Sequence, residues 1–576
     1  MAAARARRAV RRGPGRADGQ GRRHAGQQRP QAGHVVLLRV HRPGPGPVRT
    51  GRGHRARARR HGAADGRRRR AADRLPREQP RPPDRGLTQG RIAPPPNGWE
   101  IGVSSPLLGP VTAPGGRRPR VPGPRTPREM SAALDGFRDS VAAGMSHLHR
   151  TYGPVAAVGA GPLRWTFLFG AEANELVLGS TENFEFSYGG LQAIAGDTAL
   201  VALPNAENRA MRQVLRPLFD REHVDTYADR VLDRVRDRLA AWPRGGTVDA
   251  YAELRHAVRL ASVDSFIGPG VIAREGDALD ATLEQLHTVL NRSSVLTLLL
   301  WNAPRLGRLR LRGPLGRVDR VVRAEIARRR AGRTTTPEPA DPIGFLLRPE
   351  VHSALPAGDD TVRDTVVSLL IASYDPTSSA LGWSLHGLLA HPEVLAKARR
   401  EVARELGDEP VRASTARRLK YLGHVVAEAL RVHPPVVASA RRCVRAFDLH
   451  GHRIPAGSRI MLSQFTSHRS PESWADPERF DPERWDRTGA AATAVPPSAY
   501  FPYGSPRRRC PGSGMAAVIV PAVLAAVLQA GDVALADDRP PRLDGFAALR
   551  PKAGIPVRVP RRRGAGRDTS AHTENT

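Results

Sequence analysis

One cysteine stands in a sequence context that favours metal binding. Cys510 follows the three arginines Arg507–Arg509 and precedes Pro511, a residue typical of the first turn of a helix. A helix N-terminus and nearby guanidinium groups both favour a thiolate, so we expect a lowered pKa for Cys510. A lone thiolate cannot complete a zinc or iron–sulfur site, but it can be the axial ligand of a haem iron. Cys443 lacks such neighbours and is expected to be a small buried apolar residue.

Charged residues at helical spacing occur in the segment EALRVHPP. Glu428 and Arg431 are three residues apart and share one face of a helix, which must end before Pro434. Taken alone, the pair is typical of a solvated surface ion pair, which contributes little stability. A glutamate that is buried and flanked by arginines would instead be held by bidentate hydrogen bonds.

An Asp-Pro-Thr sequence interrupts the apolar segment LLIASYDPTSSALGW. Pro376 removes the backbone hydrogen bond to the Ala372 carbonyl, so the segment predicts a kinked helix with Asp375 and Thr377 at its centre. One interpretation is a tolerated kink in a long core helix. The other is a functional opening in that helix.

The pattern of apolar residues predicts a mainly α fold with a minor β part. Helical periodicity dominates the middle of the chain, and short apolar runs between turn residues indicate strands. The expected elements are a helix at 131–153, two strands around a Gly-Pro turn at 154–170, mainly helices from 205 to 430, strands at 436–465, a helix at 514–530 and a hairpin-like stretch at 548–560.

Composition divides the chain into four parts. The first 90 residues contain 25 arginines, no lysine and five acidic residues, and so hold +20 of the net charge of +34. Residues 1–95 cannot bury enough apolar surface to offset ordering entropy, so we expect a disordered extension or a misassigned start. We expect residues 96–130 to be a Pro/Gly-rich linker, 131–560 to form one folded domain, and 561–576 to be a disordered tail.

The chain shows no signal for export or for a membrane span. The longest apolar run, at 515–528, is interrupted by Pro521 and is shorter than the roughly 20 residues that a span needs. The N-terminus lacks the apolar core of a secretion signal, and two cysteines argue against a disulfide framework. We therefore expect a cytoplasmic protein, and we expect no nucleic-acid partner because the basic extension has almost no aromatic residues for base stacking.

The segment PYGSPRRRCPG resembles the haem-binding loop of the cytochrome P-450 family, in its bacterial soluble type. Tyr503, Pro506, Arg508 and Gly512 stand at the characteristic offsets from Cys510, with Tyr503 in place of the usual Phe and Pro506 in place of the usual Gly. The resemblance implies the cytochrome P-450 fold in a single haem domain. It also implies haem b (iron protoporphyrin IX) as cofactor, Cys510 as the iron ligand and Arg508 as a propionate contact.

Further segments resemble the family in the order in which it carries them. EALRVHPP is similar to its E-x-x-R motif, and WADPERFDPERW is similar to its meander, which implies Arg484 as a third partner of Glu428 and Arg431. The trio would brace the cysteine loop and do no chemistry. The segments NRAMRQVLRPLF and VVASARR imply Arg212 and Arg441 as further haem contacts.

The Asp-Pro-Thr segment resembles the family's oxygen-side helix. Ala372 and Asp375 match its pattern, whereas Ser373 replaces a Gly and Pro376 replaces a Thr. The resemblance implies that Asp375 delivers protons to bound oxygen. Thr377, one position after the usual alcohol, is the candidate for the second proton-delivering group, and a water or the substrate is the alternative.

These residues predict a haem-thiolate monooxygenase that hydroxylates or epoxidises an apolar small molecule with O2. No flavin- or nicotinamide-binding segment is evident, so we expect electrons from separate partners, a ferredoxin and a ferredoxin reductase. One alternative is a haem-thiolate protein with other chemistry, such as peroxide use, isomerisation or ligand binding alone. Another is a basic nucleic-acid-binding protein that acts through residues 1–95.

Overall fold

The residues that the structure describes all lie in the second of two units of the chain. Two units, Met1–Leu87 and Thr88–Thr576, divide it. The extension 1–95, most of the linker 96–130 and the tail 561–576 lie outside the described residues. The structure, a computed structural model, describes residues 120–560 with the exception of 181, 188–191, 193, 292–303, 333–340, 487–494, 505 and 546.

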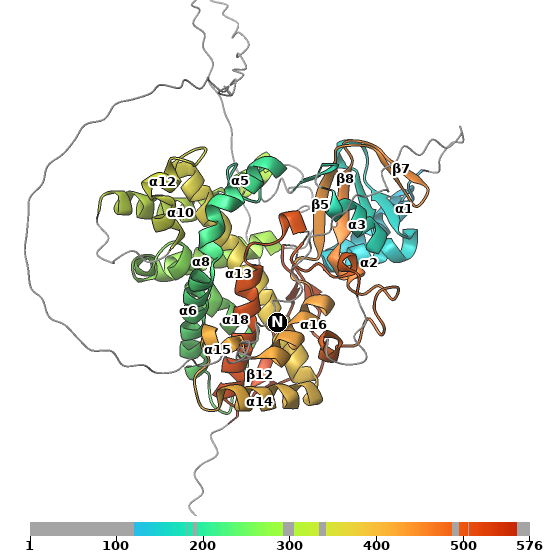
Figure 1. Ribbon diagram of the computed structural model, residues 1–576. Coiled ribbons are helices and arrows are strands. Elements are labelled where there is room, and N and C mark those ends of the chain that lie inside the picture. The colour runs from blue at the N-terminus through green and yellow to red at the C-terminus, as the bar shows by residue number, and fades with distance from the viewer. Residues whose placement is uncertain are drawn as a thin grey trace, which may run out of the picture. The chain divides into compact units, whose positions relative to one another are not determined.

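Helices dominate the described part of the chain, which confirms the expected fold class (Figure 1). Short 3-10 turns also occur, including η2 (Gly161–Leu163) between two strands and η4 (Pro482–Trp485). The α-helices are α1 (Pro127–Asp139), α2 (Val141–Tyr152), α3 (Ala171–Gly179), α5 (Asn205–Leu215), α6 (Arg221–Ala240), α7 (Ala250–Phe266), α8 (Pro269–Asn291), α10 (Pro304–Arg330), α11 (Pro342–Leu346), α12 (Pro349–His352), α13 (Asp359–Ala390), α14 (Pro392–Leu406), α15 (Ala413–Ala416), α16 (Lys420–Val432), α17 (Gln464–Ser467) and α18 (Ser513–Ala530).

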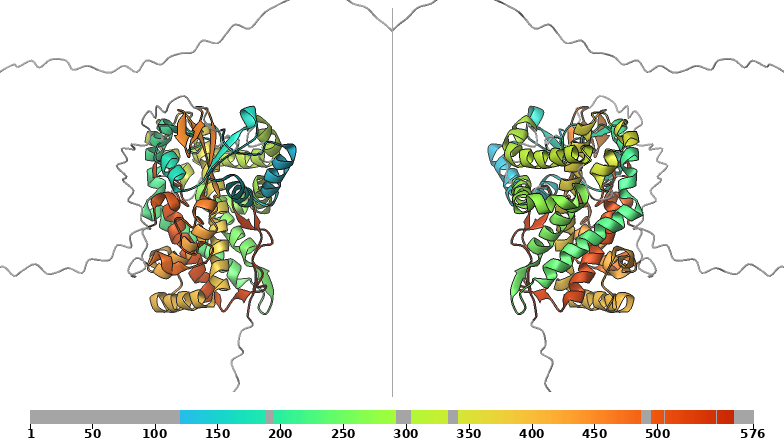
Figure 2. Two further views of the ribbon diagram at one scale, coloured as in Figure 1. Left: turned by 90° about the vertical axis from the view of Figure 1, so that its right-hand side faces the viewer. Right: turned by 90° about the vertical axis from the view of Figure 1, so that its left-hand side faces the viewer.

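The largest sheet has five strands in the order β1-β2-β8-β5-β3, with β2 and β8 parallel and the other neighbours antiparallel. Helices α1, α2 and α3 lie beside this sheet, and α14 lies at the opposite end of the body (Figure 1, Figure 2). The strands are β1 (Val155–Val158), β2 (Trp165–Leu168), β3 (Phe184–Phe186), β4 (Thr247–Asp249), β5 (Ala438–Cys443), β6 (Phe447–Leu449), β7 (His452–Ile454), β8 (Arg459–Ser463), β9 (Ala534–Leu535), β10 (Leu543–Asp544), β11 (Arg550–Pro551) and β12 (Pro556–Arg558).

Two long apolar helices form the centre of the helical region. Helix α13 has 32 residues and continues through Pro376, and it packs against α7, α16 and α18. Helix α18 is long and apolar enough to cross a membrane by composition, but most of its residues are buried in the core with side chains of α6, α7 and α13. Its apolar character is therefore explained by packing between helices.

The helix predicted over 131–153 is in fact two helices. Ser140 has the extended dihedrals φ −163° and ψ 161°, and its hydroxyl accepts a hydrogen bond from the Ala143 amide at 3.1 Å. A serine in this conformation is a favoured N-cap, so α2 begins after it and α1 ends before it. The first helix begins at Pro127, with Thr126 as its cap, rather than at residue 131.

Strands were predicted near both ends of the domain, and the structure confirms one of these predictions and contradicts the other. The two strands predicted over 154–170 are confirmed, since β1 and β2 pair in antiparallel fashion around η2. The hairpin predicted over 548–560 is wrong. Strand β11 pairs with β10, whereas β12 pairs with β4 and β9, so two separate small sheets take up this segment.

Candidate active site

The cysteine loop folds back on itself before α18. The Cys510 amide donates a hydrogen bond to the Tyr503 carbonyl at 2.8 Å, and Gly504 turns the chain between them with a φ of 80°. The Ser513 amide donates to the Cys510 carbonyl at 3.3 Å, and α18 begins at Ser513. Pro511 therefore precedes the helix instead of opening it, and Cys510 lies in the turn that leads into the helix.

The Cys510 thiol is desolvated and yet accessible. Burial raises its pKa, and this effect exceeds the opposing effects of the Gly512 amide, Arg212 and Arg509. The lowered pKa expected from the sequence is wrong, because the charges near the thiol are outweighed by its desolvation. The side chain nevertheless remains exposed to solvent. A side chain that is enclosed by protein and still accessible borders a recess rather than the outer surface.

The three arginines predicted as cofactor contacts lie close to one another. The guanidinium groups of Arg441 and Arg508 lie 4.8 Å and 5.2 Å from the ring centre of Phe186. Arg212 donates a hydrogen bond to the Arg509 carbonyl at 2.8 Å, and its charge is close enough to act on the thiol. The structure thus brings together residues from α5, β5 and the cysteine loop.

These arginines repel one another. Burial, together with the charges of neighbouring arginines that include Arg212 and Arg441, lowers the pKa of Arg508 to about 10. Among the described residues, Arg508 donates hydrogen bonds to two neutral oxygens, Asn205 Oδ1 at 3.0 Å and the Leu203 carbonyl at 2.7 Å. A partly buried cluster of like charges of this kind is stabilised by an anionic ligand.

A second accessible position lies in the middle of α13. Ala372 is exposed within a stretch of helix whose other residues are buried or half-buried, and Pro376 follows one turn later on the same face. The described residues contain no group of three or more His, Cys, Asp or Glu side chains that could hold a metal ion. A thiol in a recess, an accessible helix face and a cluster of guanidinium groups fit a haem, which brings its own iron and two propionates.

Glu428 and Arg431 form a fully buried ion pair. Arg431 Nε and Nη2 donate to the two carboxylate oxygens of Glu428 at 2.9 Å and 2.8 Å, and both side chains have 0% exposure. Arg431 also donates to the carbonyls of His468, Pro477 and Arg479 at 2.9 Å, 2.6 Å and 2.9 Å. The pair is therefore a structural junction between α16 and the meander, and not the solvated surface pair that it resembles in isolation.

Arg484 lies at this junction as the third charged partner, but its contact is weaker. Its Nε is 3.4 Å from Glu428 Oε1 and forms no aligned hydrogen bond, while its Nη2 donates to the Asp476 carbonyl at 2.8 Å. Sequence reasoning missed Trp485, whose indole N–H donates to Glu428 Oε2 at 3.0 Å. The Asp481 amide donates to Oε1 at 2.9 Å.

A second set of contacts joins this junction to the cysteine loop. Tyr500 donates its hydroxyl to the Ala427 carbonyl at 3.0 Å, and the Phe501 amide donates to His468 Nε2 at 3.0 Å. His468 is completely buried, and burial lowers its pKa to about 3. The imidazole therefore stays neutral and holds the start of the cysteine loop against α16.

Asp375 and Thr377 lie on different sides of α13. Asp375 is 5% exposed and contacts His287 and Asn291 of α8, with 3.1 Å from Asn291 Nδ2 to its Oδ2. Thr377 is half-buried. Ser373, which occupies the usual glycine position, donates its hydroxyl to Ser262 Oγ at 3.0 Å. The structure therefore separates the two predicted proton-transfer residues and gives Asp375 partners that the sequence did not indicate.

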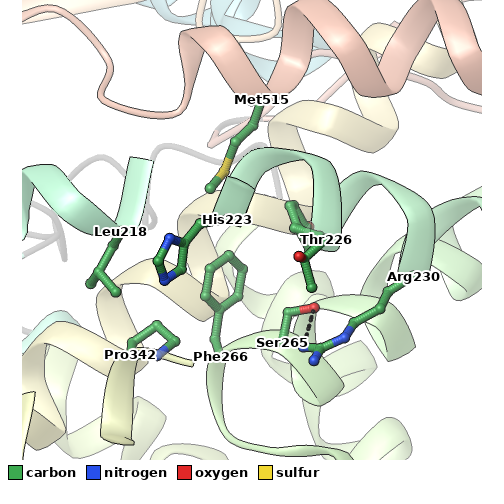
Figure 3. Close-up of a pocket in the computed structure, with 9 residues that line it drawn as sticks. Leu218, His223, Thr226, Arg230, Ser265, Phe266, Pro342 and Met515 are labelled. Atoms are coloured by element: carbon green, nitrogen blue, oxygen red, sulfur yellow. Dashed lines mark hydrogen bonds between the residues drawn. The ribbon is translucent and has the colours of Figure 1, made fainter. Parts of the chain in front are cut away.

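A small pocket elsewhere does not coincide with these residues. It lies between α6, α7, α11 and α18 (Figure 3). From α18, Met515 lines this pocket, five positions after Cys510. None of the predicted site residues lines the pocket. The sequence also predicts that the apolar segments around 186–203 and 288–303 line the substrate pocket, and both segments fall partly outside the described residues.

Comparison with known proteins assigns the chain to a family. The Cytochrome P450 family matches residues 122–558. "Putative cytochrome P450 139" of Mycobacterium tuberculosis is 33% identical over 417 residues, which are 72% of this chain and 96% of that protein. "Pentalenene oxygenase" of Streptomyces avermitilis is 29% identical over 375 residues, which are 64% of this chain and 79% of that protein.

A solved structure shows the same fold. The cyanobacterial CYP120A1 structure, described as bound to retinoic acid, has a TM-score of 0.67 and 23% sequence identity, and the match covers 77% of this chain and 99% of that one. The resemblance found in the sequence is thereby confirmed, and with it the haem cofactor and the use of O2. The chain belongs to the cytochrome P450 family of haem-dependent monooxygenases.

Proposed function

We propose that this protein hydroxylates or epoxidises an apolar small molecule with O2, and that Cys510 would bind the iron of its haem. The accessible but desolvated Cys510 thiol beside a cluster of arginines carries this proposal. The bound haem would supply the activation of O2, and the chain would supply the ligand, the pocket and the path for protons.

The residues near the thiol would hold the cofactor. Arg212, Arg441 and Arg508 would bind the propionates, which would relieve the repulsion between their guanidinium groups. Tyr503 would fix the loop through its carbonyl, and the Gly512 amide, whose hydrogen bond lowers the thiol pKa, would support a thiolate.

Two further sets of residues would act without touching the iron. Glu428, Arg431 and Arg484 would keep the cysteine loop in place through the contacts of the meander. Asp375 and Thr377 on α13 would hold or transfer protons. Groups that act in this way must lie within hydrogen-bond reach of the reacting atoms or of an intervening water.

The apolar substrate class is supported by the residues around the accessible face of α13. Ile371, next to the exposed Ala372, packs against a cluster of apolar side chains from α8, α10 and the segment before α5. The name of the Streptomyces avermitilis relative describes an oxygenase of pentalenene. The cluster consists of Ile194, Leu286, Leu290, Leu311 and Leu315.

Electrons would come from a ferredoxin that is reduced by its own reductase. Arg507 is exposed in the cysteine loop, next to Arg508 and Arg509, and an acidic surface would be attracted to it. Complementary charges of this kind accelerate association at low ionic strength. Reduction by an acidic ferredoxin should therefore slow as salt increases, and a rate that is independent of salt would contradict docking at these arginines.

Oxygen insertion can be tested with labelled gas. The purified protein, a ferredoxin, its reductase and a panel of apolar substrates are incubated under ¹⁸O₂, and products are analysed by mass spectrometry. Incorporation of one ¹⁸O atom per product, absent with Cys510→Ala, supports the proposal. Oxidised products without ¹⁸O from O2 would contradict it.

A second candidate function is favoured by Pro376. This residue shares a face of α13 with the accessible Ala372 and has no hydroxyl group to assist proton delivery. The protein would then use peroxide, isomerise its substrate or only bind it. Product formation with hydrogen peroxide, and none with O2 and an electron donor, distinguishes this candidate from the first.

A further inference from the structure

Two side chains of α8 enclose the carboxylate of Asp375. His287 and Asn291 are one turn apart at the end of α8 and have exposures of 1% and 0%. His287 Nδ1 contacts Asp375 Oδ1, and Asn291 Nδ2 donates to Asp375 Oδ2 at 3.1 Å. Oδ1 forms no aligned hydrogen bond with the described residues, so the close contact with His287 Nδ1 is the polar contact that this buried oxygen has there.

The tautomer of His287 follows from its second nitrogen. Arg550 Nη1 lies 2.9 Å from His287 Nε2, and a guanidinium group can only donate. Nε2 is therefore the acceptor, and Nδ1 carries the hydrogen that faces Asp375. Arg550 itself is fixed by two hydrogen bonds to Asp544 Oδ2, at 3.2 Å and 2.9 Å.

The orientation of the Asn291 amide is fixed independently. The Ala548 amide donates to Asn291 Oδ1 at 2.8 Å, which leaves Nδ2 facing Asp375. Asn291 Nδ2 also lies 3.1 Å from His287 Nδ1. With both nitrogens protonated, this approach joins two donors and is not a hydrogen bond. The two residues thus offer three N–H groups toward Asp375 and the main chain.

The other charged and titratable groups around Asp375 and His287 come from α7, α8, α13, β10 and β11. Burial, with the charge of Asp375 as the next cause, raises the pKa values of Tyr251 and Tyr374, which places a carboxylate close to both phenols. The facing groups are Tyr251 and Arg255 on α7, Glu284 on α8, Tyr374 on α13, Asp544 on β10 and Arg550 on β11.

We propose that His287 is a positioning residue for proton delivery by Asp375, and that Arg550 sets its tautomer. His287 would hold the carboxylate in one orientation through Nδ1–H, while Arg550 and Asp544 keep Nε2 occupied. The strand pair β10–β11 is thereby connected to α13 through α8. This proposal rests on the proposed oxygenase function, in which Asp375 serves the proton path.

Replacement of His287 should uncouple oxygen use from product formation. In His287→Ala the buried Oδ1 loses its partner, and the carboxylate must reorient or take up a proton. A misplacement of about 1 Å can cost on the order of a hundredfold in rate, so we expect a tenfold to hundredfold loss of product per O2 consumed. His287→Gln keeps an N–H donor and should recover part of this loss, but with a changed pH profile.

A spectroscopic measurement tests the geometry without turnover. In the diamagnetic carbon monoxide complex with ¹⁵N-labelled histidine, His287 should show the neutral Nδ1–H tautomer. Arg550→Gln should shift it toward a mixture of tautomers. His424→Gln, a histidine on α16 outside this network, serves as the matched control for assignment and for coupling.

The outcomes separate this proposal from the function on which it rests. A thiolate-type carbon monoxide spectrum that persists in every variant, together with loss of coupling in His287→Ala, supports the positioning role. Unchanged coupling, or an Nε2–H tautomer in the unmodified protein, overturns it. If His287→Ala does not fold, Arg550→Gln and the tautomer measurement still decide. Absence of the thiolate-type spectrum in the unmodified protein would instead refute the proposed function.

Discussion

On the cysteine side of the molecule, Glu428 accepts hydrogen bonds from Arg431, from Trp485 and from the Asp481 amide. On α13, the described residues that contact the carboxylate of Asp375 are His287 and Asn291, and both belong to α8. The first carboxylate joins a helix to a long loop. The second contacts side chains of one neighbouring helix.

The two carboxylates also differ in what they hold in place. Arg431 donates to the backbone carbonyls of Pro477 and Arg479 in the meander and of His468 before it, so the pair specifies the path of the chain. By contrast, α13 remains one continuous helix although Pro376 and Ser373 replace the usual residues. Buried charges that hold a backbone are costly to alter, because each change leaves an unpaired group behind.

The largest effect is expected at Glu428. Glu428→Ala leaves the buried guanidinium of Arg431 without its counter-ion, and breaking such a pair costs about 3–5 kcal/mol. The protein should fail to retain haem or should unfold at much lower denaturant concentration. Arg484→Gln, which removes the 3.4 Å contact with Glu428 and one hydrogen bond to the Asp476 carbonyl, is the matched control and should cost about 1–2 kcal/mol.

Urea titrations followed by circular dichroism and by Soret absorbance would measure both variants. Equal losses of stability in Glu428→Ala and Arg484→Gln would contradict the ranking of the two contacts.

A smaller effect is expected from acid, through His468. Its pKa is about 3 in the folded protein and about 6.5 in an unfolded chain. Between these values the unfolded state binds a proton that the folded state does not, so stability falls as pH falls, by about 1.4 kcal/mol per pH unit. Above pH 6.5 this contribution is constant. At pH 5 the loss is about 2 kcal/mol.

Unfolding free energies of the unmodified protein and His468→Gln, measured from pH 8 to pH 5, isolate this contribution. His386 and His433, whose pKa values are also lowered by burial, contribute equally to both proteins. The variant should lose less stability on acidification, and parallel curves would argue against a buried neutral His468.

The smallest of the three effects is expected at Thr377 of α13. Thr377→Val removes the one hydroxyl beside Pro376 and keeps the shape of the side chain. If Thr377 helps to deliver protons, product per O2 should fall on the order of tenfold, which corresponds to about 1.4 kcal/mol. Peroxide release and oxygen consumption measured together give the coupling. Unchanged coupling would show that Thr377 does not replace the missing alcohol.

Local patterns predicted most of the cysteine side. The Cys510 loop, Glu428, Arg431 and Arg484 lie within segments whose composition is distinctive, and the structure brings them together. Trp485 is adjacent to Arg484 in the meander, so the sequence could have indicated its indole N–H as a further donor to Glu428. The two helices at the start of the domain could also have been separated, since Ser140 is a recognisable N-cap.

The partners of Asp375 could not be predicted in this way. Asn291 and Asp375 are 84 positions apart, and His287 and Arg550 are 263 positions apart, so only the packing of α8 and β11 against α13 brings them together. The predicted lowering of the Cys510 pKa was wrong for a related reason. The arginines beside it are visible in the sequence, whereas its desolvation depends on residues that arrive through the fold.

The carbon monoxide difference spectrum of the reduced protein tests the central claim most directly. The unmodified protein and Cys443→Ala should both give a Soret band at the long-wavelength position of thiolate-ligated haem. Cys510→Ala should lose that band. A band at the position of histidine-ligated haem in the unmodified protein, or its persistence at the thiolate position in Cys510→Ala, would contradict the assignment of Cys510 as the iron ligand.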